Sequence, residues 1–378
     1  MPDGLNLWDH GRILLTTDAV GGVWRYTLDL ARGMASRGLA PVIAVLGPPP
    51  DASQRAEAAG LERVETGLKL DWTAESAAEL EQTVTALRAL ASGARSVHLH
   101  APALAGHHRW PMPVVAVAHS CTATWWHAVR GGALPADFAW RAAATGAGLR
   151  TADAVIAPTR AHADQVQTVY GEIAIQIVPN GAPPPPLLPL PLAGLGRRAD
   201  QGRGEGGPPQ QQSARRAQSV LAAGRLWDEG KNLTALDRIA PMLDQPIYAA
   251  GPIAGPNGAA IALPHLHLLG SLSATDMQAA YTRNTVFAAP ARYEPFGLSV
   301  LEAALAGMRL VLWDIPSFRE LWDGVARFVA DDAALLDALR AALTQPGDGG
   351  AQTRAQRYTL GAMVAATIDV HRHVGASV

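Results

Sequence analysis

The chain has 378 residues and 48% of them are hydrophobic, so it is long enough for two domains with large apolar cores. A net charge of −2 argues against a general nucleic-acid-binding protein, and the single cysteine, Cys121, excludes an internal disulfide. The N-terminal residues lack the features of a signal peptide and no apolar run could span a bilayer, so we expect a cytoplasmic protein, with peripheral membrane contact left open.

A strand, a glycine pair and a helix open the chain. Residues 12–18 are typical of a buried strand, residues 23–37 carry apolar side chains at helical spacing, and residues 41–46 predict a second strand. Gly21 and Gly22 lie in the first turn, and because neither carries a Cβ, the backbone there can approach a pyrophosphate closely. The spacing is not GxGxxG, which disfavours nicotinamide binding, and a plain tight turn is the alternative.

Histidines occur at the ends of two predicted strands. His119 follows the apolar run 113–118, and ligands bind at the carboxyl ends of strands in open α/β sheets. A structural loop histidine is the alternative at this position. His98 and His100 alternate with apolar residues and have no carboxylate or cysteine at metal-ligand spacing, so we expect them to line the core or a cleft.

Residues 182–216 differ in composition from the rest of the chain. A proline run is followed by glycines, glutamines and scattered arginines, without hydrophobic periodicity. This composition predicts a flexible linker between two domains. Its arginines could contact acidic lipid head groups, but a solvated tether is the favoured interpretation. The first domain would end just before it, at the strand and Pro-Asn-Gly turn of residues 175–181.

Two cations follow the first strand of the second domain. Residues 219–224 are typical of a buried strand, Arg225 comes directly after it, and Lys231 lies six positions further on. Departure of a nucleoside diphosphate requires positive charge where negative charge develops, and these side chains can supply it. Two unrelated surface cations are the alternative. Leu272 follows a later predicted strand, residues 266–270.

The stretch from Glu294 to Glu302 organises the second domain. Apolar strands are predicted at residues 285–289 and 310–313, with a loop and a helix between them, so the region forms a βαβ unit of a parallel sheet. The loop holds Glu294 at the carboxyl end of a strand. Backbone N–H groups at the start of the following helix favour a phosphate. Those groups belong to Phe296, Gly297 and Leu298.

Glu302 lies just over one turn into this helix, close enough to its start to reach a sugar hydroxyl. A capped helix with two solvated glutamates is the alternative interpretation. The two glutamates, eight positions apart and flanking Pro-Phe-Gly-Leu, resemble the E-x7-E motif of retaining glycosyltransferases with the GT-B fold, of the family-4 type. The Gly-Gly turn, the Pro-Asn-Gly turn and the Arg225–Lys231 pair also resemble this family. The resemblance covers nearly the whole chain except residues 182–216.

The resemblance implies an α/β fold of the GT-B type, with two Rossmann-like domains facing each other across a cleft. Residues 1–181 would form the N-terminal acceptor domain, and residues 217–355 the C-terminal nucleotide-sugar domain. Residues 182–216 would link them. Residues 356–378 would form a C-terminal helix that packs back on the first domain.

The resemblance also implies a retaining, hexosyltransferase-like enzyme that moves a sugar from a nucleotide-diphosphate sugar to a hydroxyl of a sugar, lipid or small-molecule acceptor. The donor would be a substrate and not a resident cofactor. The chain has no D-x-D string and no metal-ligand cluster, which favours a metal-independent mechanism. The implied catalytic residues are His119 and Glu294 at the sugar and Arg225 and Lys231 at the diphosphate. The implied donor-binding residues are Arg225, Lys231, the Gly21-Gly22 turn and the amides of Phe296, Gly297 and Leu298 at the diphosphate, Glu302 at the ribose and Leu272 near the base.

Two other functions fit the same motifs. One is an epimerase or hydrolase that acts on the nucleotide sugar itself, and the other is a sugar-nucleotide-binding protein without catalysis. The intact set of charged residues disfavours the second. The sequence leaves open the donor, the acceptor and the oligomeric state. It also leaves open whether Trp125 and Trp126 stack on a sugar or cover the domain core.

Overall fold

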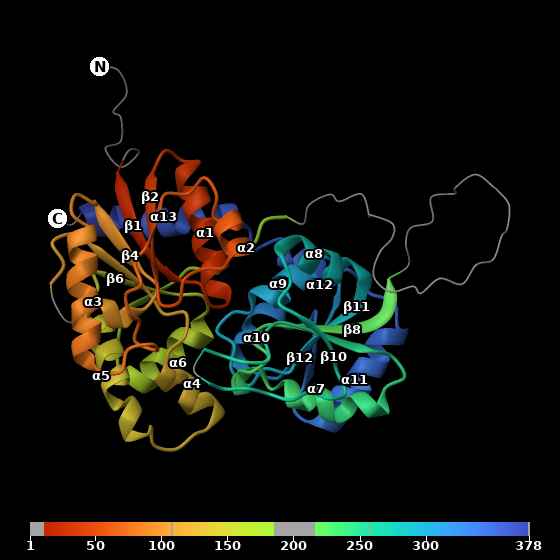
Figure 1. Cartoon of the computed structure of the whole chain (residues 1–378). Helices are drawn as coiled ribbons and strands as arrows, with labels where there is room; N and C mark the ends of the chain where they lie inside the picture. The colour runs from red at the N-terminus through yellow and green to blue at the C-terminus, as the bar shows by residue number, and fades with distance from the viewer. Residues whose placement is uncertain (1–10, 107–108, 185–215, 257, 377–378) are drawn as a thin grey trace.

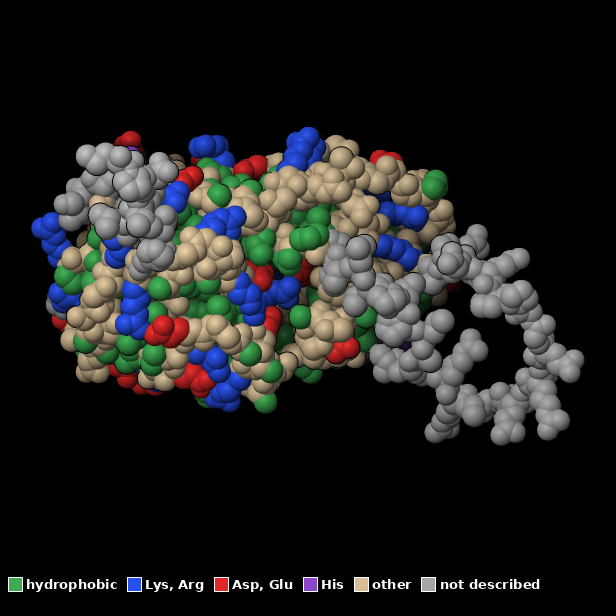
Figure 2. Space-filling model, turned by 90° about the horizontal axis from the view of Figure 1, so that it is seen from above, with side chains coloured by type: hydrophobic (Ala, Val, Ile, Leu, Met, Phe, Trp, Pro, Cys, Tyr) green, Lys and Arg blue, Asp and Glu red, His purple; other side chains and the backbone are tan. Residues whose placement is uncertain are grey.

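The computed structural model describes residues 11–106, 109–184, 216–256 and 258–376, and shows two domains, each a parallel sheet covered by helices (Figure 1). This confirms the expected α/β architecture. No helix of these described ranges is long and apolar enough to cross a membrane. On the face shown in Figure 2, positive and negative side chains are interspersed.

The first domain is built on a seven-stranded sheet with the order β3-β2-β1-β4-β5-β6-β7, in which every pair is parallel. Its central strands are short runs of buried aliphatic residues, because helices cover both faces. The strand order reverses between β1 and β4, which is where ligands bind in sheets of this kind. The strands are β1 (Arg12–Asp18), β2 (Ala40–Leu46), β3 (Arg63–Glu65), β4 (Ser96–Leu99), β5 (Val114–Val117), β6 (Ala154–Ala157) and β7 (Ile175–Ile177). The helices are α1 (Gly22–Ala35), α2 (Ala52–Glu57), α3 (Ala77–Leu90), α4 (Thr122–Val129), α5 (Ala136–Thr151) and α6 (Arg160–Tyr170), with a 3-10 turn, η1 (Pro102–Ala105).

The second domain has a six-stranded parallel sheet with the order β10-β9-β8-β11-β12-β13. Here the order reverses between β8 and β11, so the segments after these two strands lie at the position expected for a ligand. The strands are β8 (Ala217–Ala223), β9 (Ile247–Ala250), β10 (His267–Gly270), β11 (Asn284–Ala289), β12 (Arg309–Trp313) and β13 (Arg327–Val329). The helices are α7 (Leu233–Ile239), α8 (Ala274–Arg283), α9 (Leu298–Leu305), α10 (Pro316–Trp322), α11 (Asp332–Thr344), α12 (Gly350–Ala355) and α13 (Leu360–Ala376), with 3-10 turns η2 (Glu229–Lys231) and η3 (Ala240–Met242).

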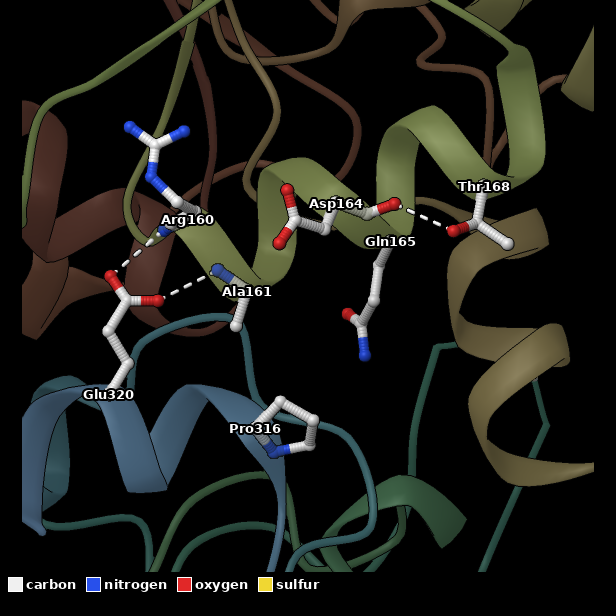
Figure 3. Close-up of a pocket in the computed structure, with 7 residues that line it drawn as sticks. All are labelled: Arg160, Ala161, Asp164, Gln165, Thr168, Pro316 and Glu320. Carbon is white, nitrogen blue, oxygen red and sulfur yellow. Dashed lines mark hydrogen bonds between the residues drawn. The ribbon is translucent and has the colours of Figure 1, made fainter.

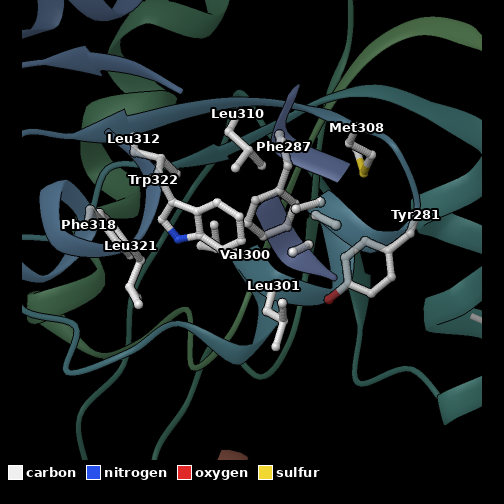
Figure 4. Close-up of a cluster of buried hydrophobic side chains, with 14 of the residues drawn as sticks. Tyr281, Phe287, Val300, Leu301, Met308, Leu310, Leu312, Phe318, Leu321 and Trp322 are labelled. Carbon is white, nitrogen blue, oxygen red and sulfur yellow. The ribbon is translucent and has the colours of Figure 1, made fainter. Parts of the chain in front are cut away.

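A dense apolar cluster packs α8, α9 and α10 against one face of the second sheet (Figure 4). Phe287 of β11, Phe318 and Trp322 of α10 and Tyr281 of α8 are its largest fully buried side chains. Truncating a buried aromatic residue of this kind to alanine costs about 3–5 kcal/mol. The cluster therefore fixes α9, and with it the loop that carries Glu294.

The last helix, α13, packs on the first domain, as the resemblance implies. Met363, Val364, Ile368 and Val370 join a core cluster that includes residues of β1 and α1. In Figure 1, α13 lies beside β1 and α1 of the first domain. The C-terminal segment therefore completes the first domain.

The helical segment at the C-terminal end of the described residues is not continuous. The structure breaks it into α12 and α13, and residues 356–359 between them form a turn and an extended segment. Ala182 pairs with Thr359 in an isolated parallel bridge, its N–H donating to the carbonyl of Tyr358 at 3.2 Å. This contact between distant parts of the chain draws the backbone out of the helical conformation.

The two described ends of the expected linker are packed against the domains. Ala182 is 5% exposed, and Arg216 donates to the backbone carbonyls of Asn284 and Ala306. The middle of the expected linker, residues 185–215, lies outside the described residues.

Candidate functional site

The turn after β1 faces the second domain. Gly21 has a φ of +81°, in the region that favours glycine, and a Cβ there would lie 3.5 Å from Cδ of Arg225. A Cβ on Gly22 would lie 3.7 Å from Cδ1 of Leu298. Two predicted diphosphate contacts from the first domain therefore meet two from the second, although each pair is more than two hundred positions apart in the sequence.

Asp18, which ends β1, was not identified from the sequence. One carboxylate oxygen accepts from the N–H of Val20 at 2.8 Å and the other from Nε1 of Trp72 at 3.3 Å. Burial raises the pKa of Asp18 to about 6, against the lowering effects of these bonds and of nearby Arg225. The sequence signal was its place at the carboxyl end of the first strand.

A tight turn brings Arg225 and Lys231 to the end of β8. Asp228 organises it, because one carboxylate oxygen accepts from Arg225 at 2.8 Å and the other from the N–H of Gly230 at 2.9 Å. Asn232 follows in the left-handed region, with φ 54°, and its side chain donates to the carbonyl of Pro290 at 3.1 Å. Asp228 and Asn232 thus hold the turn that carries Arg225 and Lys231. The spacing of the two cations in the sequence did not predict this role.

Glu294 lies beside Lys231, as an ion pair between the carboxylate and the ammonium group. Their side chains are 16% and 19% exposed, so both charges are only partly solvated. Ser317 of α10 donates to the backbone carbonyl of Glu294, and this bond holds the loop between β11 and α9 against α10. The predicted sugar-contacting glutamate and a predicted diphosphate-binding lysine therefore form one unit.

The start of α9 presents backbone donors, as the sequence predicts. Gly297 is its N-cap with φ 90°, and none of the described side chains caps this helix end. A Cβ at Gly297 would lie 3.1 Å from the ring of Phe318, so a larger residue would be both strained and crowded. The side chain of Phe296 is buried in the apolar cluster, which leaves only its backbone for a ligand. Leu272 and Leu298 both pack against this cluster from its edge.

Glu302 accepts a hydrogen bond from the hydroxyl of Tyr281 at 3.0 Å. Burial raises the pKa of Glu302, and the charge of Arg25 on α1 acts in the opposite direction. Tyr281 is buried in the core, and its orienting bond to Glu302 was not predicted from the sequence. Arg25 was also missed, because it comes from the other domain.

His119 lies just after β5, and its Nε2 is 2.8 Å from Nδ1 of His100. Its ring packs edge-on against Tyr26 at a centroid distance of 4.7 Å. Burial lowers the pKa of His119 to about 3, with a smaller effect from His162, so the ring is neutral. Burial in turn lowers the pKa of His162, and the charge of Glu294 acts in the opposite direction. The two predicted sugar-contacting residues, His119 and Glu294, therefore both lie near the imidazole of His162.

Trp125 bridges the domains and does not simply cover a core. Its Nε1 donates to Asp228 at 2.9 Å, in the turn that carries the cations. The hydroxyls of Thr124 and Tyr293 lie 2.8 Å apart across the same boundary. Trp126 packs beside Phe138 of α5, at a centroid distance of 6.1 Å. The two tryptophans therefore have different roles.

A cavity of about 550 Å³ lies between α6 and α10 (Figure 3). Beside it, the carboxylate of Glu320 accepts from the N–H groups of Arg160 and Ala161 at 2.9 and 2.7 Å, and so caps α6 from the other domain. Glu320 therefore links the second domain to the first. The cavity is lined by none of the predicted donor-site residues, so its size alone does not mark the site. Among the described residues, no group of three potential metal ligands converges.

The two halves of the chain match two family models. Residues 20–184 match Glycosyltransferase Family 4, and residues 217–345 match Glycosyl transferases group 1. The chain belongs to the family-4 type of glycosyltransferase. The two matches lie in the two sheet domains, and they exclude most of the segment between them.

Solved structures confirm the GT-B fold of this glycosyltransferase. Sucrose-phosphate synthase from Thermosynechococcus elongatus is 17% identical with a TM-score of 0.73, and the alignment covers 98% of this chain and 100% of that one. HepE from Anabaena, solved in complex with UDP-glucose, is 16% identical with a TM-score of 0.68, covering 96% and 100%. A glycosyltransferase from Rickettsia africae is 13% identical with a TM-score of 0.65, covering 97% and 98%. No curated protein matches the chain.

Proposed function

We propose that this glycosyltransferase moves a hexosyl group from a nucleoside-diphosphate sugar to an acceptor hydroxyl, with retention of anomeric configuration and without a metal ion. The observation that carries the proposal is the meeting of the Gly21-Gly22 turn with Arg225 and Leu298, beside Lys231. Glycine backbone, two cations and a free helix N-terminus together form a site for two phosphates. HepE, which shares the fold, was solved with UDP-glucose, and this supports a uridine nucleotide as the first donor to test.

Transfer would break the bond between the anomeric carbon and the β-phosphate oxygen. The acceptor oxygen would bond to the same face of that carbon, and its proton would pass to the departing phosphate. Arg225 and Lys231 would stabilise the charge that develops on the diphosphate, which is most valuable in a partly buried site. Glu294 would stabilise the positively charged sugar, and Glu302, oriented by Tyr281, would accept from the ribose hydroxyls.

The Lys231–Glu294 ion pair suggests how binding of the donor could make Glu294 available to the sugar. In the ligand-free protein each side chain neutralises the other. A bound diphosphate would compete for Lys231, and this would free a carboxylate oxygen of Glu294 for the sugar. Binding of the leaving group would thereby activate the residue at the bond that breaks.

Calorimetric titration with UDP and with UDP-glucose tests the donor site. We expect binding by the wild type, and weaker binding by Lys231→Ala with the fold retained. An NMR assay of the product would then show whether the anomeric configuration of the donor is kept. Rapid consumption of donor without any acceptor would instead indicate a hydrolase or epimerase, and inversion would overturn the retaining mechanism.

A further inference from the structure

Four histidines lead from the cleft into the first domain. His119 pairs with His100 at 2.8 Å, and the rings of His100 and His98 lie edge to face at a centroid distance of 4.8 Å. Nδ1 of His98 is 3.0 Å from Nε2 of His371 on α13, and Nδ1 of His371 is 2.9 Å from the hydroxyl of Ser96. The row thus contains two hydrogen-bonded imidazole pairs, one at the site and one behind it.

All four rings are neutral, because burial lowers the pKa of each one. A neutral imidazole carries one N–H and one bare nitrogen, so each pair has a definite donor and acceptor. Which ring donates is decided by the atoms that have no partner. Among the described residues, Nε2 of His98 and Nε2 of His100 are buried without a hydrogen bond.

A buried N–H without an acceptor costs more free energy than a buried nitrogen lone pair without a donor, and unsatisfied buried donors are accordingly rarer in folded proteins than unsatisfied acceptors. The unpartnered Nε2 atoms of His98 and His100 are therefore the bare ones, and both rings carry their proton on Nδ1. Each Nδ1–H then donates to the Nε2 of its partner, which is His371 or His119. It follows that His119 holds its own proton on Nδ1.

The Nδ1 atom of His119 has no protein partner among the described residues, and His119 is a partly exposed residue at the carboxyl end of β5. We propose that His100 is a positioning residue, whose Nδ1–H fixes His119 in the Nδ1–H tautomer so that His119 offers a hydrogen-bond donor to a hydroxyl of the transferred sugar. This role rests on the proposed function, whereas the tautomer is a property of the free protein. His100 acts only through His119 and does not contact the substrate.

The tautomer can be measured without any substrate. A long-range proton–nitrogen correlation spectrum of the protein labelled with 15N-histidine distinguishes protonated from bare ring nitrogens, and His119→Gln assigns the signals of His119. We expect Nδ1 of His119 to be protonated and Nε2 to be bare at pH 7. A protonated Nε2 would overturn the proposal, whether or not the protein proves to transfer a sugar.

The kinetic test compares substitutions within the two pairs. His100→Leu removes the donor, and we expect kcat to fall about tenfold, the effect of losing one hydrogen bond, with little change in the donor KM. His100→Asn places an amide N–H near the position of Nδ1 and should recover most of kcat. His98→Leu is the matched control, because His98 is also buried but is bonded to His371, and it should leave kcat within a few-fold of wild type.

Equal losses in His100→Leu and His100→Asn would overturn the positioning role and indicate a packing effect, as would an equal loss in His98→Leu. An unchanged kcat in His100→Leu would overturn it as well. Failure of the wild type to bind any nucleoside diphosphate would refute the proposed function, and the NMR spectrum would still decide the tautomer.

Discussion

The two sides of the cleft differ in how they present polar groups. The side formed by the second domain carries charges that are already paired, Arg225 with Asp228 and Lys231 with Glu294. The first domain contributes a glycine turn and neutral imidazoles hydrogen-bonded to one another, chiefly His119 with His100. Charge is thus concentrated where a diphosphate would bind, while the opposite side can orient neutral hydroxyls. The second domain would therefore supply the charges that recognise the leaving group, together with Glu294 at the sugar, whereas the first domain would add the glycine turn at the diphosphate and neutral imidazoles at the sugar.

Removing a cation is the strongest way to break this division. Arg225→Ala or Lys231→Ala should lower kcat by about 10²–10³, roughly 2.7–4 kcal/mol, the usual loss when a preorganised group is taken from a developing charge. Arg238→Ala is a suitable control, because that exposed arginine pairs with Asp332 away from the donor site and its loss should leave kcat unchanged. Near-wild-type rates in both site variants at saturating donor would show that the diphosphate binds elsewhere.

The two glutamates should separate into different kinetic roles. Glu294→Gln removes a charge next to the bond that breaks and should lower kcat on the order of 100-fold, because the charge favours the transition state over the ground state. Glu302→Gln should raise the donor KM with little change in kcat, since ribose contacts are alike in both states. Steady-state kinetics with one donor measures both effects. The reverse pattern would show that the roles are exchanged.

The buried histidines predict loss of stability in acid. The unfolded chain takes up protons near the ordinary histidine pKa of 6.5, whereas the folded protein resists them until about pH 4 or 3, so the free energy of unfolding falls as the pH drops through this window. His98→Leu removes one such group and should reduce the loss between pH 7 and pH 5 by about 2 kcal/mol. Asp18 acts in the opposite direction, because its pKa is raised to about 6, but it is present in both proteins and cancels in the comparison.

Urea unfolding of both proteins at pH 7 and pH 5 measures this difference. His265→Leu provides the control, since that histidine is exposed and belongs to the second domain. The same pH dependence in wild type and His98→Leu would mean that His98 is not held neutral by the fold.

The cap that Glu320 provides across the domain boundary should give the smallest effect. Glu320→Gln keeps the size of the side chain but removes the negative charge at the start of α6, and we expect a loss of about 0.5–1 kcal/mol. Urea unfolding measures it, and Glu172→Gln, an exposed residue beyond the end of α6, is the control. An effect no larger than in the control would show that the two domains hold their arrangement without this bond.

Much of the fold could be predicted from the sequence because its strands are short, buried and bounded by turn residues. The site residues at strand ends, such as Arg225 and Glu294, followed from the same pattern together with the motif spacing. The contacts between distant segments could not be predicted. His98 and His371 are 273 positions apart, and nothing in either local sequence indicates a pair.

The groups that orient the predicted residues were missed for the same reason. Tyr281 has an ordinary core position in α8, and only the packing of α8 beside α9 directs its hydroxyl to Glu302. Asp228 lies between the two predicted cations, yet a carboxylate next to a phosphate site would not be chosen from charge alone. The break before α13 likewise involves a distant residue, because Thr359 in the break pairs with Ala182, which follows the last strand of the first domain.

The packing of α13 on the first domain has a consequence for how the chain folds during synthesis. Residues of this helix share a core with Ile13, Leu15 and Met34, which leave the ribosome hundreds of residues earlier. Until α13 emerges, that part of the first sheet is covered only in part, by α1, and exposes apolar surface of the kind that promotes aggregation. The first domain therefore cannot complete its folding before the second has been made, and a ribosome that stalls in the second domain would release a chain in which neither half is finished.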